Sequence, residues 1–310
     1  MKNSISVVIP VYNSELILPA LIGRLVPALE KISESFEILL INDGSRDYSW
    51  QVVSTLSKEN KSIVGINLMR NYGQHNATLC GIFQAKYEVV VTMDDDLQHP
   101  PEEIHKLIAK LEEGYDVVYG NPQQHPQNWW RNLASGLIKR VLAYVMGVTT
   151  LKYIGPFRAI RTNLRKAFLG FNKPEVIIDI LFSWGTHKFG SVNVEENLRP
   201  QGRSNYNLRK LVRTALTVLT GFSTAPLRIT SLIGFIFMLG GIAAFIYVVI
   251  IYFSVGSVLG FSFLASLISL FSGAILFALG IFGEYQARIF ERTSERPCFT
   301  IDNTTDGEGE

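Results

Sequence analysis

The sequence predicts an α/β fold with a mostly parallel sheet, and two observations support this prediction. Five short apolar runs rich in Val and Ile alternate with segments of helical length. Such alternation is typical of strands joined by crossover helices. Polar residues also gather where each of the first four runs ends. Because open α/β sheets bind ligands beyond the carboxyl ends of their strands, the sequence predicts a site at that edge.

The elements follow one another in regular order. The expected strands are residues 5–12, 36–43, 62–69, 88–94 and 115–120. The expected helices are residues 14–34, 46–60, 74–86 and 101–113. The polar residues that follow the first four strands are Asn13 and Glu15, Asp43 and Ser45, Arg70 and Asn71, and residues 94–98.

Several common functions lose their main support. The sequence has no G-x-G-x-x-G after the first strand and no G-x-x-x-x-G-K-[ST], which argues against a dinucleotide oxidoreductase and a P-loop NTPase. A net charge of +2 gives no sign of nucleic acid binding, and no nucleic acid partner is expected. Cys80 and Cys298 lie far apart without metal-ligand spacing, which fits a reducing compartment.

Three adjacent aspartates follow the fourth strand in "VVVTMDDDLQHPPEEI", residues 89–104. Adjacent carboxylates repel one another unless a cation neutralises them. On an extended chain Asp94 and Asp96 point the same way, so they could face one ligand while Asp95 points elsewhere. Two carboxylates with phosphate oxygens suit Mg²⁺ or Mn²⁺.

The alternative for this stretch is a solvated loop that caps a helix. It explains the prolines and glutamates at 100–103, but not three aspartates at the end of a strand. The nearby His99, His105 and His125 are expected to be surface or packing residues rather than metal ligands.

The C-terminal third contains two uncharged apolar runs, residues 229–253 and 262–283. Each exceeds the roughly 20 residues that cross a bilayer core, so we expect a hairpin of two transmembrane helices rather than buried core helices. Arginine and lysine flank the pair on its outer sides, and the linker at 254–260 is short and uncharged. The positive-inside rule then predicts a multi-pass membrane protein with both termini and the soluble part in the cytoplasm. No signal peptide is expected at the N-terminus.

Four motifs in this order, "VVIPVYN", "LLINDGSRD", "LMRNYGQHNA" and "MDDDLQHPPE", resemble glycosyltransferase family 2 with its Rossmann-like GT-A fold. With the predicted hairpin and "GEYQARIFERTSERPCF", the chain resembles the polyprenyl-phosphate glycosyltransferases, the group of bactoprenol glucosyltransferase and dolichyl-phosphate mannose synthase. The likeness covers residues 5–299.

The resemblance implies a nucleotide sugar bound across the strand ends. It assigns the donor to Pro10, Tyr12, Glu15, Asp43, Arg70 and Asp94. It assigns a Mg²⁺ or Mn²⁺ ion on the diphosphate to Asp94, Asp96 and Gln98, and it implies Asp94, Asp96 and Arg158 as catalytic residues. Such an ion neutralises charge that builds on the leaving nucleoside diphosphate.

The acceptor is expected to be a lipid. Residues 128–147 and 207–222 read as basic amphipathic helices at a membrane interface, with ordinary globular packing as the alternative. The segments 155–161 and 196–206 resemble family segments near the acceptor phosphate, and their candidate residues are Arg158, Arg199, Arg203, Ser204 and Tyr206. Pro156 and Asn205 depart from the pattern of many relatives.

The resulting prediction is a membrane-bound inverting glycosyltransferase that moves one sugar from a nucleotide donor to polyprenyl phosphate at the cytoplasmic face. UDP-glucose is the favoured donor, and GDP-mannose is the alternative. The expected organisation is a nucleotide-sugar-binding core at 1–127, an acceptor-side part at 128–224, the hairpin at 225–290 and a cytoplasmic tail at 291–310.

Two other readings remain open. A processive polysaccharide synthase shares the fold, but "QNWWR" at 127–131 has the wrong order for its Q-x-x-R-W segment. A membrane scaffold or transporter subunit would use the hairpin without catalysis. Small residues at Ala265, Ser269 and Gly273 indicate helix packing, which could pair the two spans or join chains into a homo-oligomer.

Overall fold

The computed structural model describes residues 4–122, 154–173, 176–197, 225–255, 260–293 and 296–306, with only part of the side chains in the two long C-terminal helices. The chain divides into two units, residues 1–206 with 295–310, and residues 207–294. The expected amphipathic helices at 128–147 and 207–222 lie outside the described residues. So do four of the expected acceptor residues, Arg199, Arg203, Ser204 and Tyr206.

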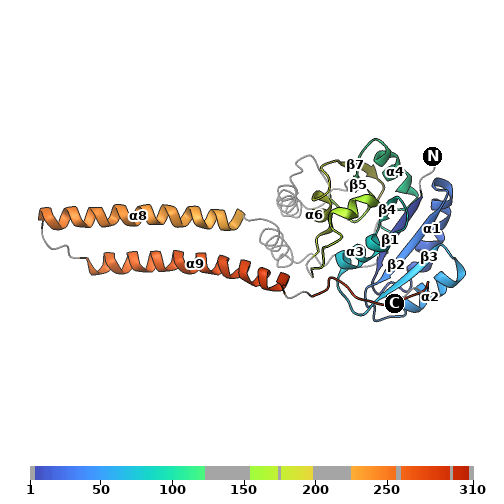
Figure 1. Ribbon diagram of the computed structural model, residues 1–310, viewed down its shortest axis with the longest axis horizontal. Coiled ribbons are helices and arrows are strands. Elements are labelled where there is room, and N and C mark those ends of the chain that lie inside the picture. The colour runs from blue at the N-terminus through green and yellow to red at the C-terminus, as the bar shows by residue number, and fades with distance from the viewer. Residues whose placement is uncertain are drawn as a thin grey trace. The chain divides into compact units, whose positions relative to one another are not determined.

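The first unit contains an eight-stranded sheet with the order β7-β5-β6-β4-β1-β2-β3-β8 (Figure 1). The strands are β1 Ile5–Val11, β2 Phe36–Asn42, β3 Ile63–Leu68, β4 Val89–Thr92, β5 Val117–Pro122, β6 Arg158–Arg161, β7 Phe189–Val194 and β8 Ile301–Thr304. The helical segments of this unit are α1 Leu18–Ile32, α2 Ser49–Glu59, α3 Gln74–Gln84, η1 Pro101–Glu103, α4 Ile104–Glu112, η2 Thr162–Ala167 and α6 Ile178–Ser183.

The predicted alternation of strands and helices is confirmed. β1 pairs in parallel with β2 and β4, and β2 pairs in parallel with β3. The five expected strands correspond to β1 to β5, and the four expected helices correspond to α1, α2, α3 and the η1–α4 pair. Their ends move by a few residues, most of all at α1, which begins at Leu18 instead of residue 14.

Helices cover both faces of this sheet, which explains why the strand runs are apolar throughout. Every residue of β1 is buried. One core cluster joins Val7 of β1 to Leu21 of α1 and Leu107 of α4. On the other side α3 lies close, since a Cβ added at Gly81 would come within 2.2 Å of a methyl group of Val8. Parallel strands covered on both faces need apolar side chains in both directions.

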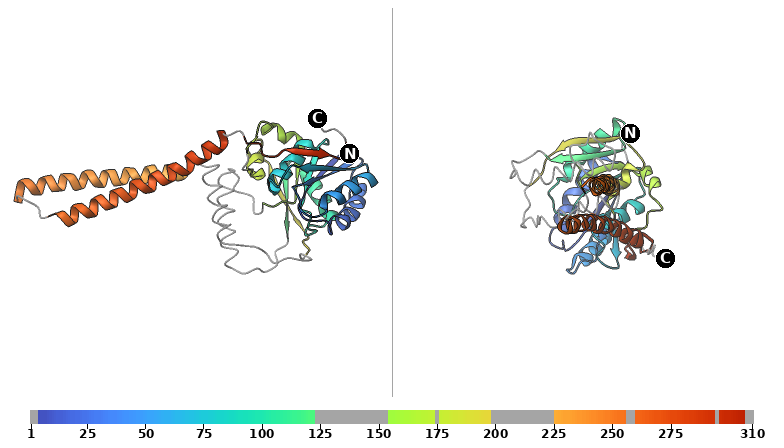
Figure 2. Two further views of the ribbon diagram at one scale, coloured as in Figure 1. Left: turned by 90° about the horizontal axis from the view of Figure 1, so that it is seen from below. Right: turned by 90° about the vertical axis from the view of Figure 1, so that its left-hand side faces the viewer.

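Three strands were not expected from the sequence. β6 is only four residues long, carries two arginines and runs antiparallel to both β4 and β5. β7 pairs in parallel with β5. β8 comes from the C-terminal tail and pairs antiparallel with β3 (Figure 2). The tail segment is therefore part of the sheet, and its Cys298 is buried.

The second unit contains two long helices, α8 Ala225–Val255 and α9 Phe261–Thr293. They pack together where the Phe237 ring meets the Phe271 ring edge-on, with 6.1 Å between centroids. Gly241 allows this approach, since an added Cβ would lie 3.3 Å from the Phe271 ring. An added Cβ at Gly273 would meet nothing within 4 Å.

Large apolar side chains on both helices of this unit are exposed. They include Leu232, Phe235, Ile236 and Ile250 on α8 and Ile268, Ile275, Leu276 and Phe277 on α9. Counting only the residues that the structure describes, no helix is long and apolar enough to cross a membrane.

Candidate functional site

A cavity of about 590 Å³ lies at the carboxyl ends of β1, β2 and β4. Its lining combines an apolar part, a set of amides and four carboxylates. The lining residues are Pro10, Val11, Tyr12, Leu16, Ile17, Asp43, Asn71, Gly73, Gln74, Asp94, Asp95 and Asp96. Since β1, β2 and β4 run in parallel, their carboxyl ends meet at one edge, which is where the sequence placed the site.

Asp43 is buried at the end of β2 and holds the start of α3. Its Oδ1 accepts the Tyr72 N–H at 2.7 Å, and its Oδ2 accepts the Gly73 N–H at 2.9 Å. Burial raises the pKa of the Asp43 carboxyl, and these two donors oppose the shift only in part. Gly44 follows with φ of +60°, and an added Cβ would lie 2.5 Å from the Asn71 nitrogen, so the turn requires glycine.

Asp95 joins the end of β4 to the end of β1. Its Oδ2 accepts hydrogen bonds from the Ser14 hydroxyl and, at 3.3 Å, from the Tyr12 N–H. Burial raises the pKa of the Asp95 carboxyl, and the charge of Asp96 raises it further. Asp95 thus has different contacts from Asp94 and Asp96. The expectation that it points away from the ligand was wrong, because it lines the same cavity.

Asp94 and Asp96 both reach the cavity, as expected. The Gln74 amide donates to Asp94 Oδ1, and the Gln98 N–H donates to Asp96 Oδ1 at 3.1 Å. No group of three or more His, Cys, Asp and Glu that could hold a metal ion occurs among the described residues. Oxygen donors of this kind fit Mg²⁺ or Mn²⁺ only together with oxygens from a bound ligand and water, which is how Mg²⁺ commonly binds at phosphate sites.

Three expected donor or metal residues do not line the cavity within the described part of the chain. Glu15 Oε2 accepts the Tyr48 N–H at 2.8 Å, next to the first turn of α2. Arg70 is exposed, with its guanidinium carbon 4.6 Å from the centroid of the Tyr72 ring. Gln98 uses its backbone, donating to Asp96 and accepting the Asn197 N–H at 2.7 Å.

Arg158, the expected catalytic and acceptor residue, is 3 % exposed and forms an ion pair with Asp179. Its Nε also donates to Thr92 Oγ1 at 3.0 Å, and the Tyr119 hydroxyl donates to Asp179 at 2.8 Å. Burial is the largest single influence on the pKa of Arg158 and lowers it, but the Asp179 carboxylate and the Tyr119 hydroxyl together outweigh burial and raise the pKa. In this conformation its guanidinium is used to hold β6, β4 and α6 together.

The nearby histidines have packing or surface positions. His99 is buried and stacks on Phe157, with ring centroids 5.0 Å apart. His105 is exposed, and its Nδ1 lies 2.6 Å from the carbonyl oxygen of Glu102. His125 lies outside the described residues.

Two side chains that donate hydrogen bonds to the cavity carboxylates, Ser14 and Gln74, were missed by the sequence reasoning. Both are polar residues just beyond strands whose ends were already expected to form the site. Ser14 lies in the loop after β1, and Gln74 is the first residue of α3, a few positions after β3. Position beyond a strand end was the only signal available for them.

The chain matches known proteins over most of its length. The model of "Glycosyl transferase family 2" matches residues 6–169. The "Undecaprenyl-phosphate 4-deoxy-4-formamido-L-arabinose transferase" of Shewanella sediminis (strain HAW-EB3) is 37 % identical over 314 aligned residues, covering 98 % of this chain and 93 % of the relative.

Solved structures share the fold at lower identity. Glucosyl-3-phosphoglycerate synthase from Mycobacterium tuberculosis, in complex with Mn²⁺, UDP-glucose and phosphoglyceric acid, matches with a TM-score of 0.53 and 18 % identity. That match covers 71 % of this chain and 79 % of the other chain. The same enzyme with Mn²⁺ and UDP-glucose alone matches with a TM-score of 0.51 and 18 % identity, over 70 % of this chain and 77 % of the other. Together these likenesses show an α/β fold of the GT-A type.

Proposed function

This chain belongs to glycosyltransferase family 2 and is a glycosyltransferase, and from that premise we propose that it transfers one sugar from a nucleotide donor to a polyprenyl phosphate. The observation that carries the proposal is the 37 % identity to a transferase named for undecaprenyl phosphate, which extends over 93 % of that relative. The likeness therefore includes the acceptor-side and C-terminal segments as well as the nucleotide-binding core.

The donor binds in the cavity at the carboxyl ends of β1, β2 and β4. Tyr12 and Pro10 offer apolar surface for a base, and the Asp43 carboxylate offers acceptors for ribose hydroxyls. Glu15 and Arg70 remain candidates for donor contacts after a change of rotamer. The placement of Asp43 and Asp94 at opposite strands of one cavity supports a ligand that spans both.

Asp94 and Asp96, with Gln98 as a further candidate, would hold Mg²⁺ or Mn²⁺ against the donor diphosphate. The fold relatives that contain Mn²⁺ and UDP-glucose make a divalent ion a reasonable expectation for this site. When bound, such an ion offsets the charge that develops on the leaving nucleoside diphosphate.

The reaction proposed is an in-line displacement with inversion at the anomeric carbon. An oxygen of the acceptor phosphate forms a bond to that carbon while the bond to the nucleoside diphosphate breaks. A phosphate monoester with a second pKa near 6 is largely dianionic at neutral pH, so no catalytic base is needed. Arg158, Arg199, Arg203, Ser204 and Tyr206 are the candidates to hold the acceptor phosphate.

A lipid acceptor requires the enzyme to work at a membrane. We attribute membrane attachment to a hairpin of the uncharged runs 229–253 and 262–283, with both termini in the cytoplasm. The exposed apolar side chains of α8 and α9 support this assignment, because water is a poor solvent for such a surface. Ser257→Cys should react with a membrane-impermeant maleimide in intact cells, and Asn3→Cys only after lysis. Labelling of both before lysis would disprove the hairpin.

Three nucleotide sugars are candidate donors. UDP-glucose follows from the resemblance to bactoprenol glucosyltransferases, with GDP-mannose as its alternative. The relative from Shewanella sediminis favours a nucleotide-linked 4-deoxy-4-formamido-L-arabinose as the third candidate. All three donors present a diphosphate to the same carboxylates, so they differ in the sugar and base contacts.

The decisive experiment incubates the purified, detergent-solubilised protein with undecaprenyl phosphate, Mn²⁺ or Mg²⁺, and each labelled donor in turn. One sugar per lipid, with the anomeric configuration inverted, supports the proposed function. A long polymer would point to a processive synthase. No label in the lipid with any donor, from protein that is folded and monodisperse, would favour a scaffold or transporter subunit.

A further inference from the structure

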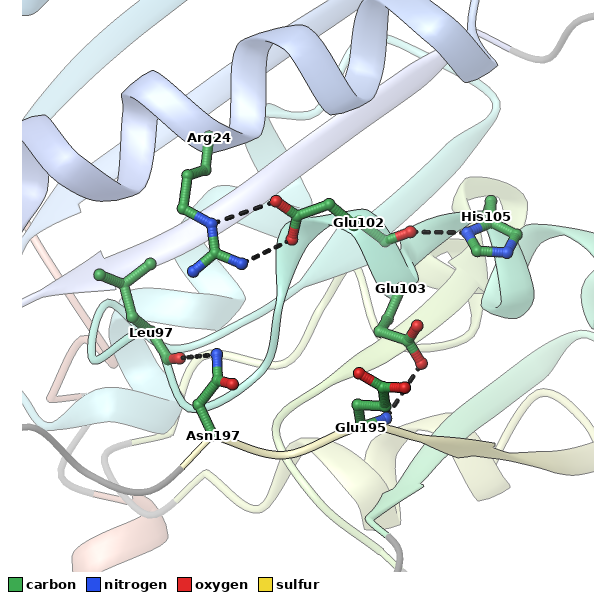
Figure 3. A network of polar contacts seen from close by, with 7 residues as sticks. All are labelled: Arg24, Leu97, Glu102, Glu103, His105, Glu195 and Asn197. Atoms are coloured by element: carbon green, nitrogen blue, oxygen red, sulfur yellow. Dashed lines mark hydrogen bonds and ion pairs between the residues drawn. The ribbon is translucent and has the colours of Figure 1, made fainter.

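The segment that follows β7 is fastened to the loop that carries the three aspartates. The Asn197 N–H donates to the Gln98 carbonyl oxygen at 2.7 Å. The Asn197 side-chain amide donates to the Leu97 carbonyl oxygen at 3.3 Å (Figure 3). One residue therefore engages two successive carbonyls directly after Asp96. Among the described residues, no other segment distant in the sequence donates a hydrogen bond to these two carbonyls.

The loop needs such support because its backbone is in a conformation that most residues avoid. Leu97 has φ of +58°, in the left-handed region that L side chains other than Asn and Asp rarely adopt. The next residue, Gln98, donates its N–H to the Asp96 carboxylate at 3.1 Å. A change of backbone at Leu97 would therefore move the Gln98 N–H and, with it, the Asp96 carboxylate.

A second connection fastens the same segment two residues earlier. The Glu195 N–H donates to Glu103 Oε2 at 3.0 Å (Figure 3). Glu103 is buried, and its carboxylate also pairs with Lys106 at 2.7 Å. The chain between Glu195 and Asn197 is thus held at both ends, once by η1 and once by the aspartate loop.

Asn197 is adjacent in the sequence to the segment proposed to hold the acceptor phosphate. Asn197 directly precedes residues 198–206, which contain the proposed acceptor-phosphate residues Arg199 and Arg203. A fixed spacing between the diphosphate side and the acceptor side of a transfer site is worth large factors in rate, because in-line attack depends on geometry.

We propose that Asn197 is a positioning residue that sets the arrangement of the Asp94–Asp96 carboxylates by holding Leu97 in its left-handed conformation. The proposal rests on the proposed function for the metal ion and the donor diphosphate at these carboxylates. It concerns only residues that the structure describes.

The first measurement needs no turnover. Mn²⁺ affinity of the purified protein is measured by electron paramagnetic resonance with UDP, and in parallel with GDP, for wild type and Asn197→Ala. Because Asn197 is exposed, the alanine variant should fold. We expect its Mn²⁺ affinity to fall by about tenfold and its kcat at saturating Mn²⁺ and donor to fall at least as much, since small misplacements cost up to about 10² in rate.

A double-mutant cycle with Leu97→Gly tests whether Asn197 acts on the carboxylates through the backbone conformation of Leu97. Glycine adopts positive φ without steric cost, so the loop no longer depends on the Asn197 amide. The loss of Mn²⁺ affinity caused by Asn197→Ala should therefore be several-fold smaller in the Leu97→Gly background. The single Leu97→Gly variant corrects for the lost packing of the leucine side chain, which is partly buried against the core.

Arg24→Ala is the matched control from the same network. Arg24 forms two hydrogen bonds to Glu102, at 3.1 and 2.8 Å, but neither reaches the aspartate loop (Figure 3). The Mn²⁺ affinity and the kcat of the Arg24→Ala variant should equal those of wild type.

Unchanged Mn²⁺ affinity in Asn197→Ala, an equal loss in both Leu97 backgrounds, or a wild-type protein that binds no Mn²⁺ with either nucleotide would each overturn the proposal. A lowered melting temperature with unchanged affinity would mean that Asn197 only stabilises the fold, and would also overturn it. If wild type binds Mn²⁺ but transfers no sugar to lipid, the proposed function fails, while the affinity measurements still decide the role of Asn197.

Discussion

The unit that contains the sheet has two kinds of buried or partly buried carboxylate, which differ in whether a cation pairs with them. At the cavity, Asp43 and Asp95 are held by backbone N–H groups and a hydroxyl, and no ion pair to either is found among the described residues. In α6, Asp179 is 5 % exposed and its carboxylate is paired with the guanidinium of Arg158 in β6. Burial raises the pKa of Asp43 and Asp95 and thus disfavours their charged forms.

The difference separates a ligand site from a structural pair. A buried ion pair is complete within the protein and mainly fixes geometry. A buried carboxylate without a cation lowers the stability of the folded protein. Its charged form is stabilised when a ligand supplies a cation or hydrogen-bond donors, so stability is lost for the sake of binding. The four predictions below test this contrast.

The largest effect is expected from Asp96→Asn. The substitution keeps the size of the side chain but removes the charge that would face a metal on the donor diphosphate, so transfer should fall by about 10³-fold or more, several kcal/mol in the transition state. Asparagine keeps the Oδ1 acceptor that receives the Gln98 N–H, so the melting temperature should stay within a few degrees of wild type. Near-normal turnover in a folded Asp96→Asn protein would remove the basis for the metal site.

On the structural side, Arg158→Met should lower the free energy of unfolding by about 3–5 kcal/mol, because it leaves Asp179 charged and buried without its partner. Adding Asp179→Leu should restore most of that loss, since both charges are then replaced by apolar groups. Urea denaturation of the detergent-solubilised protein measures both values.

The same pair of variants decides whether Arg158 is also catalytic. If Arg158 only holds β6 to α6, the double variant regains transfer together with stability. If its guanidinium contacts the acceptor phosphate during the reaction, stability returns and transfer does not. A double variant as unstable as the single one would contradict the ion-pair account.

Asp43→Asn should separate stability from binding. The pKa of Asp43 is raised above its ordinary value of 3.8, so the folded protein holds this proton more tightly than the unfolded chain. The wild-type protein therefore loses stability as the pH rises from about 3.8 towards the raised pKa, and the variant does not. The amide of the Asp43→Asn variant has only one acceptor oxygen for the Tyr72 and Gly73 N–H groups, so the variant should lose some stability at every pH. Between pH 4 and pH 7, however, the melting temperature of the wild type should fall relative to that of the variant.

Donor affinity should fall in the same variant. Loss of a charged acceptor for ribose hydroxyls is expected to weaken nucleotide binding about tenfold at pH 7, which isothermal titration calorimetry can measure. A melting-temperature difference that is the same at pH 4 and pH 7 would show that burial of Asp43 carries no cost. Asn42→Ala, at the neighbouring position of β2, should leave any pH-dependent part of stability unchanged.

Much of the parallel half of the sheet could be predicted from sequence. β1 to β4 are local apolar runs, and polar residues such as Asp43, Asp94 and Asp96 follow their carboxyl ends, so the strands and the edge that carries the candidate site could be predicted from the same pattern, although the strand order could not. β6 and β8 could not be predicted this way. β6 is four residues long and begins and ends with an arginine, and β8 pairs with β3 across more than 200 positions, so neither leaves a periodic signal.

The hydrogen-bond and ion-pair partners of the site residues could not be predicted from the sequence either. Nothing near Arg158 in the sequence reveals Asp179, and nothing near Asp95 reveals Ser14, because both contacts join segments that only the folded chain brings together. The sequence identified which residue types would matter. Whether a given charge faces a ligand or a protein partner depended on tertiary pairing.

The smallest effect is expected at Arg24, whose pair with Glu102 resembles neither group. The two side chains are 40 % and 54 % exposed, so water screens their attraction. Arg24→Ala should therefore lower the free energy of unfolding by less than about 1 kcal/mol, and the difference should vanish in 1 M salt. Arg158→Met, by contrast, should keep its full cost in salt, because a buried charge is screened far less. If the Arg24 variant lost several kcal/mol, or if salt reduced the two losses equally, exposure would not be what separates these ion pairs.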